Sequence, residues 1–89
     1  MVEHFKNKEA EYEAWLQENS TGFVFNYFGT AANNKLHHAR CGQLFRKDNV
    51  DSRTTLDKYC SDNYAELEAK VISLCDDKWS KCGLCYKSG

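Results

Sequence analysis

The sequence lacks proline, long apolar runs and an excess of charge of either sign, and each absence excludes a class of protein. Its 89 residues include no Pro, and 12 Lys and Arg nearly balance 13 Asp and Glu. No apolar stretch approaches a membrane span, and the N-terminus has no apolar core of a secretion signal. The net charge of −1 gives no overall electrostatic reason to bind nucleic acid. We expect a cytoplasmic protein without membrane contact.

Sequence signatures of catalysis are also missing. There is no glycine-rich phosphate loop, no nucleophile elbow and no pair of carboxylates on an obvious framework. We therefore predict no catalytic residues. The chain does contain five cysteines, and an odd number without a secretion signal favours reduced thiols. In a reducing compartment, paired cysteines are typical of metal sites or redox sites rather than structural disulfides.

The length predicts one domain, residues 1–89, with a small core. Hydrophobic residues make up 42% of the chain and aromatic residues 13%, which is enough for a folded core. Chains this short often recruit a metal, disulfides or a second subunit, because they bury a modest fraction of their surface. We expect a monomer or a weak homodimer, the dimer being favoured if the aromatic segment 23–28 is uncovered.

Apolar periodicity predicts an N-terminal helix and then a strand. Four large apolar side chains fall on one helical face: Phe5, Tyr12, Trp15 and Leu16. Residues 19–22 end this helix with poor helix formers and Gly22, which can adopt the left-handed conformation. Residues 23–28 are aromatic and β-branched, which predicts a strand covered at least partly on both faces.

Two more strands and a second helix follow. Turn residues 29–34 precede a return strand at 35–39, and alternation over residues 54–60 predicts a third strand. Asn63 then caps a helix, with Glu66 three residues later as in a capping box. The apolar face of this helix comprises Tyr64, Leu67, Val71, Leu74 and Cys75. The predicted fold is α+β: an N-terminal helix, a small three-stranded antiparallel sheet, a second helix and a C-terminal Cys-x-x-Cys knuckle.

The knuckle is Cys82 and Cys85, in Lys-Cys-Gly-Leu-Cys-Tyr. Such a turn lets two thiolates converge on one ion while backbone amides stabilise their charge. Gly83 relieves strain inside the turn. A thioredoxin-like redox pair normally opens a helix after a strand, whereas this pair ends the sequence. The knuckle therefore predicts half of a zinc site.

The other half is His37 and Cys41, where a strand carries the imidazole and the next turn brings back the thiol. Strand alternation lets only one of His37 and His38 face the site, and ligand spacing favours His37. Cys60 is either a rival ligand or a small buried core residue. We expect one structural Zn²⁺ with four ligands: His37, Cys41, Cys82 and Cys85, with Cys60 and His38 as alternatives.

The segment Leu36-His-His-Ala-Arg-Cys41, followed by a strand, a helix and Lys81-Cys-Gly-Leu-Cys85, resembles the zinc-binding domain of the bacterial alkylation-repair protein Ada. The likeness covers about residues 35–86 and rests on the order of ligands and elements. The chain also looks like small uncharacterised bacterial Cys-rich domains in which a Trp-bearing helix and a Gly-aromatic strand come first. Trp15 and Gly22-Phe23 would occupy these positions.

The resemblance implies a zinc fold but argues against methyl transfer. In the Ada domain the first ligand is a cysteine that accepts a methyl group from a DNA phosphotriester, and His37 stands at the matching position. Zinc-bound imidazole cannot replace an activated thiolate in that reaction. The connection from Cys41 to Cys82 is also longer than in Ada, and it contains Cys60, which has no role in that pattern.

A basic region surrounds the first ligand pair. Residues 35–58 hold six Lys and Arg against three Asp, whereas residues 1–34 hold two Lys against five Glu. Such a patch would add salt-dependent affinity for phosphate, but six charges offset by three Asp make a weak footprint, and solvated loop charge is the more common explanation. The candidate contact residues are Lys35, Arg40, Arg46, Lys47 and Arg53.

We therefore expect a small zinc-stabilised binding or accessory module that contacts nucleic acid or protein through residues 35–58. One alternative is a metal-linked thiol redox switch, in which Cys82 and Cys85 oxidise and release the metal. The other is a metal-free protein-interaction domain.

Overall fold

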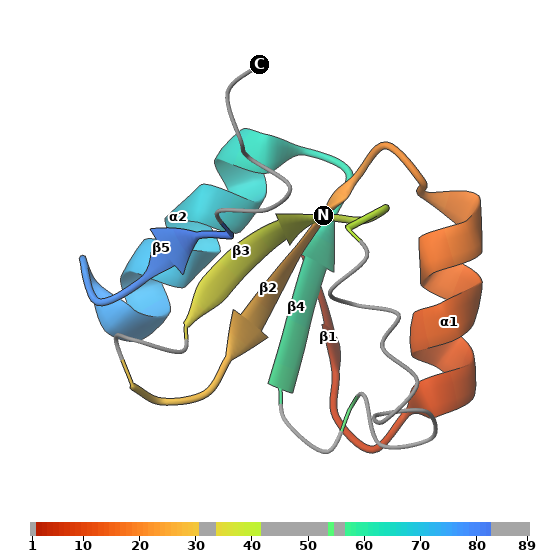
Figure 1. Cartoon of the computed structure of the whole chain (residues 1–89), viewed down its shortest axis with the longest axis horizontal. Helices are drawn as coiled ribbons and strands as arrows, with labels where there is room; N and C mark the ends of the chain where they lie inside the picture. Colours follow the sequence, from red (N-terminus) through yellow and green to blue (C-terminus); the bar gives the residue numbers. More distant parts are fainter. Residues whose placement is uncertain (1, 31–33, 42–53, 55–56, 83–89) are drawn as a thin grey trace.

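A computed structural model gives the fold of the chain (Figure 1), and it describes residues 2–30, 34–41, 54 and 57–82. Within these residues the elements follow in the order β1 (Glu3–Phe5), α1 (Glu9–Glu18), β2 (Phe23–Tyr27), β3 (Lys35–His38), β4 (Asp57–Ser61), α2 (Tyr64–Cys75) and β5 (Ser80–Lys81). None of the helices in this part of the chain is long and apolar enough to cross a membrane.

The strands form one mixed sheet in the order β1-β4-β2-β3-β5. Neighbours pair antiparallel except β3 and β5, which are parallel. The prediction of an α+β fold with two helices is confirmed, but the prediction of a three-stranded antiparallel sheet is wrong. The two additional strands are at the edges and have three and two residues, too few for a recognisable alternating pattern.

Phe5 belongs to β1 rather than to the first helix, which begins at Glu9. Its side chain is nevertheless buried with those of α1, and its ring centroid lies 6.0 Å from that of Tyr12. Asn7 reverses the chain between the two elements with a φ of 55°. The apolar pattern therefore predicted correctly which side chains pack together. It did not predict that Phe5 joins them from a strand instead of from the helix.

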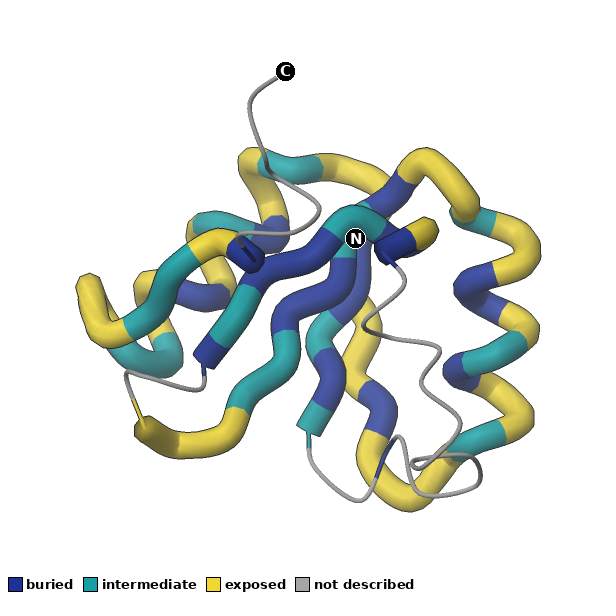
Figure 2. The backbone as a smooth tube through the Cα atoms, in the orientation of Figure 1, coloured by how far each residue is buried: buried dark blue, intermediate teal, exposed yellow. Residues whose placement is uncertain are grey.

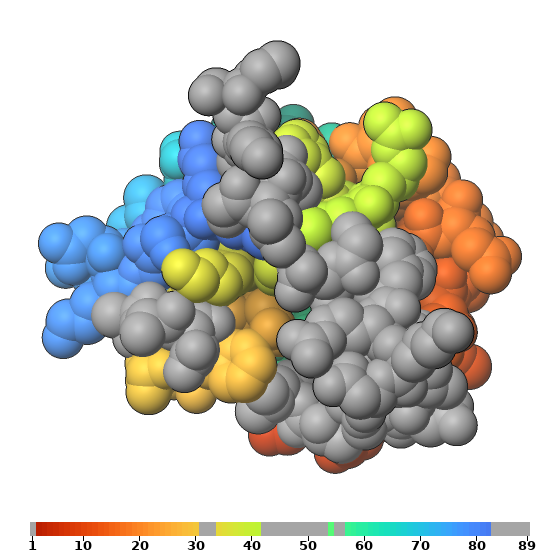
Figure 3. All heavy atoms as spheres, in the orientation of Figure 1, coloured from red at the N-terminus to blue at the C-terminus, as the bar shows by residue number. Residues whose placement is uncertain are grey.

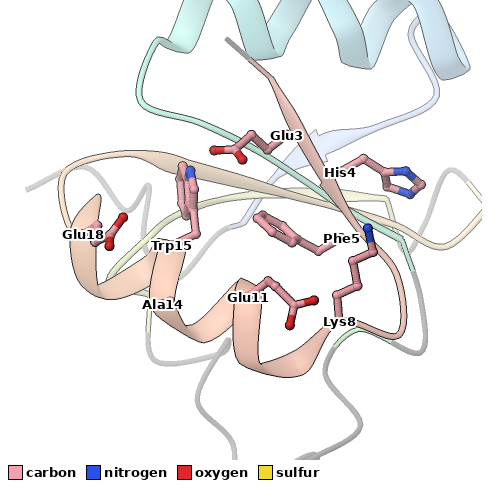
Figure 4. Close-up of a pocket in the computed structure, with 8 residues that line it drawn as sticks. All are labelled: Glu3, His4, Phe5, Lys8, Glu11, Ala14, Trp15 and Glu18. Carbon is pink, nitrogen blue, oxygen red and sulfur yellow. The ribbon is translucent and has the colours of Figure 1, made fainter.

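The helices cover opposite faces of the sheet (Figures 1 and 4). On one face, Tyr12, Trp15 and Leu16 of α1 pack in a cluster that contains Val24 and Cys60. On the other face, Leu67 and Val71 of α2 pack with Phe25 and Leu36. Figure 2 shows the resulting contrast between a buried sheet centre and exposed outer helix surfaces.

Both faces of β2 are covered within one chain. Val24 and Phe25 are fully buried on opposite sides of the sheet. This confirms the coverage predicted from the density of aromatic residues in this strand.

The second helix begins at the predicted cap. Asn63 Oδ1 accepts a hydrogen bond from the backbone N–H of Glu66 at 3.1 Å. The predicted apolar face is confirmed, since Leu67 and Val71 are buried and Tyr64, Leu74 and Cys75 pack around them.

Gly22 is needed for a close approach of elements rather than for a left-handed conformation. A Cβ atom there would lie 2.9 Å from a Trp15 ring carbon and about as close to two backbone carbonyl oxygens, 3.0 Å from that of Ser61 and 3.1 Å from that of Asn19. Gly29, in contrast, has a φ of +88° and open space around its Cβ position. The left-handed glycine expected at residue 22 is therefore found at residue 29.

Replacing Gly22 with Ala should lower the free energy of unfolding by about 1–3 kcal/mol, because the added methyl group overpacks a site bounded by backbone. Gly29→Ala, the matched control, adds backbone strain only and should cost about 1 kcal/mol. Urea denaturation of both variants measures the difference. A larger loss for Gly29→Ala than for Gly22→Ala would contradict the steric role of Gly22.

Candidate metal centre

Three side chains of the types that can bind a metal ion converge beside the paired ends of β3 and β5. His37 lies in β3, Cys41 three residues after that strand ends, and Cys82 directly after β5. One ligand atom from each lies within 4.8 Å of those of the other two. Cys82 is 41 residues beyond Cys41 in the sequence, and the sheet brings it to the other two because its backbone N–H donates to the Leu36 carbonyl at 2.8 Å.

A tight turn returns Cys41 to the site. Its backbone N–H donates to the carbonyl oxygen of His38 at 2.9 Å, and the N–H of Ala39 donates to the Gly22 carbonyl at 2.9 Å. The strand therefore carries the imidazole of His37 and the following turn brings the thiol beside it. This is the arrangement that the spacing of the two residues predicts.

The separation of the two thiols fits a shared metal ion. Cys41 Sγ and Cys82 Sγ are 3.9 Å apart. Two thiolates that bind one tetrahedral zinc ion at about 2.3 Å lie about 3.8 Å from each other. A disulfide would need about 2.05 Å, so these two thiols are not joined to each other by one.

All three side chains are buried, each residue being 5 or 6% exposed. His37 Nδ1 is buried and has no hydrogen-bond partner among the described residues. A buried polar atom without a partner is unfavourable, and a metal ion bound by the ring would explain why an imidazole occupies this position.

Burial, together with the positive charges of Lys58 and Lys35, lowers the pKa of His37 from 6.5 to about 4. The imidazole is therefore neutral near pH 7. Only the neutral ring has a lone pair to offer a metal ion. The electrostatics of the site thus favour the ligand form of His37.

The alternative ligands lie elsewhere. His38 follows His37 in β3 and therefore lies on the opposite face of the sheet. Its ring centroid lies 5.4 Å from that of Phe23. Cys60 is fully buried in the core cluster, where burial raises the pKa of its thiol. Neither residue joins the three-residue group. Cys60 therefore has the properties of a small apolar core residue.

The remaining predicted residues are only partly described. Cys85, Arg46, Lys47 and Arg53 lie outside the described residues. Lys35 Nζ donates to Ser80 Oγ at 2.7 Å and so links β3 to β5 beside the site. Arg40 is exposed, between the buried Ala39 and Cys41.

No family model, curated protein or solved structure matches this chain. The likeness to the Ada domain therefore stays a resemblance in sequence. The site is interpreted from its own geometry.

Lys58 is a buried cation that belongs neither to the predicted ligands nor to the predicted contact residues. It is 7% exposed, and its Nζ donates to Asn26 Oδ1 across the pairing of β4 with β2. Burial lowers its pKa to about 8, against the opposing effects of Cys60 and Glu9. Strand alternation places Lys58 on the same face as Cys60, and this was the signal available in the sequence.

A separate hollow of about 510 Å³ lies between β1 and α1 (Figure 4). Phe5 and Trp15 lie between the two elements, and three carboxylates surround them: Glu3, Glu11 and Glu18. It shares no residue with the three-residue cluster.

The depressed pKa of His37 predicts a loss of stability in acid. Between pH 6.5 and 4 the unfolded chain binds the His37 proton more tightly than the folded chain, so protonation favours unfolding. Stability that is fully present above pH 6.5 should fall as the pH drops through 4, by up to about 3 kcal/mol.

Urea unfolding of the protein between pH 7 and 4 measures this effect. A bound metal would add to it in the same direction, because metal binding also requires the neutral imidazole. His37→Gln should flatten the pH dependence, whereas His38→Gln should retain it. An equal pH dependence in wild type and His37→Gln would show that His37 is not responsible.

Proposed function

We propose that this chain is a small zinc-stabilised binding module without catalysis of its own. The observation that supports this most directly is the convergence of the buried side chains of His37, Cys41 and Cys82. One imidazole and two thiols form a donor set that suits zinc and disfavours magnesium or calcium. Cys85 is the proposed fourth ligand, because a Cys-x-x-Cys turn allows both thiolates to bind one ion.

A structural role follows from the position of the ligands. β5 has only two residues and lies at the edge of the sheet, so its pairing with β3 is weak by itself. A metal bound by Cys82 together with His37 and Cys41 would join this edge to the end of β3. Four protein ligands close a zinc site and leave no position for an activated water, which argues against hydrolysis.

The surrounding charges are compatible with such a centre. Zinc with three thiolates and one neutral imidazole carries a net charge of −1. Lys58 and Lys35 both act on His37, so their positive charges lie near enough to compensate that excess. Nearby positive charge favours the thiolate form of the cysteines that would bind the ion.

Native mass spectrometry should detect one zinc ion per chain. Chelation should remove the ion and unfold the protein, because the energy of metal binding contributes to folding. A metal-free chain that stays folded would overturn the proposal and leave the metal-free interaction domain as the alternative.

Variants extend the same experiment to the ligands. Cys41→Ser and Cys82→Ser should lose zinc, whereas Cys60→Ala should retain it. Cys75 is a suitable control because its thiol lies on α2 and donates to the Val71 carbonyl at 3.4 Å. Cys75→Ser should cost about 1 kcal/mol without loss of zinc. Zinc retained in Cys82→Ser but lost in Cys60→Ala would assign the ligands differently.

The distance between the thiols of Cys41 and Cys82 favours a second function, a metal-linked redox switch. After loss of metal, a small movement would allow these thiols to form a disulfide, each losing a hydrogen to a two-electron oxidant. Thiol counting with a mild oxidant should then reveal two fewer thiols in the zinc-free protein and no change in the zinc-bound protein. An unchanged count in both forms would exclude the switch.

A further inference from the structure

A pocket of about 260 Å³ lies where the segment after α1 meets the end of β3. Its lining residues are Ser20, Thr21, Gly22, Phe23, His38 and Arg40. They supply two hydroxyls, an imidazole and a guanidinium, and none of these described residues carries a carboxylate. In the space-filling view the residues after β3, in yellow-green, reach the surface beside the orange end of α1 (Figure 3).

The sheet holds the two sides of this pocket in a fixed register. Phe23 pairs with His38, and the next residue along, Ala39, donates its backbone N–H to the carbonyl of Gly22 at 2.9 Å. The N–H of Gly22 donates in turn to the Asn19 carbonyl at 2.8 Å. The polar groups are therefore presented by backbone that packing and hydrogen bonds position, which favours a preformed binding site.

The principal donors in this pocket are available to a ligand. Ser20, Thr21 and Arg40 are exposed, and within the described part of the chain their side chains form no hydrogen bond or ion pair. A guanidinium offers several N–H donors in a planar fork that matches the oxygens of a phosphate group. Hydroxyl groups beside it can donate to the remaining oxygens.

We propose that this pocket binds a phosphate group, with Arg40 as the charged anchor and the hydroxyls of Ser20 and Thr21 as additional donors. The proposal rests on the binding-module function above and specifies the chemistry of its partner. The pocket itself contains no metal ligand. Phosphate binding and metal binding can therefore succeed or fail separately.

The metal centre and the pocket share the segment 37–41. His37 and Cys41 belong to the buried cluster, while His38 and Arg40 line the pocket. Fixing the two ligands would also fix the backbone that carries the two pocket residues. A structural metal would in this way support a binding surface that it does not touch.

The test is a titration of the zinc-loaded full chain with inorganic phosphate at constant ionic strength, followed by backbone amide chemical shifts in NMR. Saturable shifts should be concentrated at residues 20–23 and 38–40. Arg40→Gln should weaken binding at least about tenfold, because hydrogen bonds to charged groups contribute more than neutral ones. Thr21→Val keeps the side-chain shape and should weaken binding about threefold to tenfold.

Lys78→Gln is the matched control for charge. It removes one exposed positive charge beyond the opposite end of β3, where the Lys78 carbonyl accepts a hydrogen bond from Asn34 Nδ2 at 2.9 Å. Its phosphate affinity should stay within about twofold of wild type if the site is local rather than a general electrostatic effect. Equal weakening in Lys78→Gln and Arg40→Gln would overturn the proposal.

Two further probes distinguish the source of the phosphate. Tighter binding of a thymidine oligonucleotide than of thymidine monophosphate would indicate a nucleic-acid backbone, and the reverse order would indicate a small phosphorylated molecule. The absence of saturable shifts with every probe, or an unchanged phosphate affinity in Arg40→Gln, would contradict the proposal that this pocket binds phosphate. The zinc content of each sample separates the zinc proposal from the phosphate proposal. Protein that contains zinc but does not bind phosphate contradicts only the phosphate proposal.

Discussion

The parallel pairing of β3 with β5 is the contact on which the candidate metal centre depends. The hydrogen bond from the Cys82 N–H to the Leu36 carbonyl holds the backbone of Cys82 beside His37 on β3 and Cys41 after it. The pairing extends over two residue pairs only, which is short for a parallel ladder. Lys35 adds a side-chain hydrogen bond to Ser80, so the edge is reinforced beside the site.

Asn34 provides the second support of this edge. Its Oδ1 accepts hydrogen bonds from the N–H groups of Phe28 and Gly29, and its Nδ2 donates to the Lys78 carbonyl. Ser80 also donates its N–H to the Asn34 carbonyl at 3.0 Å. This residue, 1% exposed, therefore connects the end of β2 with the segment that leads into β5. From the sequence Asn34 reads as an ordinary turn residue, because its long-range partners follow no local pattern.

The features predictable from the sequence were those encoded locally. The cap at Asn63, the apolar face of α2 and the buried aromatic strand each depend on residues within a few positions of one another. The spacing of His37 and Cys41 is local in the same sense. The edge strands were not predicted because two or three residues are too few to show an alternating pattern. Phe5 was assigned to the first helix because its side chain packs in the same cluster as those of α1, although it lies in β1. Burial of Lys58 depends on the tertiary fold.

The end of β3 and the turn after it place buried and exposed polar side chains next to each other in the sequence. His37 and Cys41 are 6% and 5% exposed, whereas Arg40 is exposed between them in the sequence. A metal bound by the buried side chains would have no contact with a phosphate group in the surface pocket. It would affect phosphate binding only by fixing the backbone that carries the pocket residues. A catalytic metal requires the opposite arrangement, an ion that substrate or water can reach. The geometry of this short segment therefore favours a metal that stabilises a binding surface over one that performs a reaction.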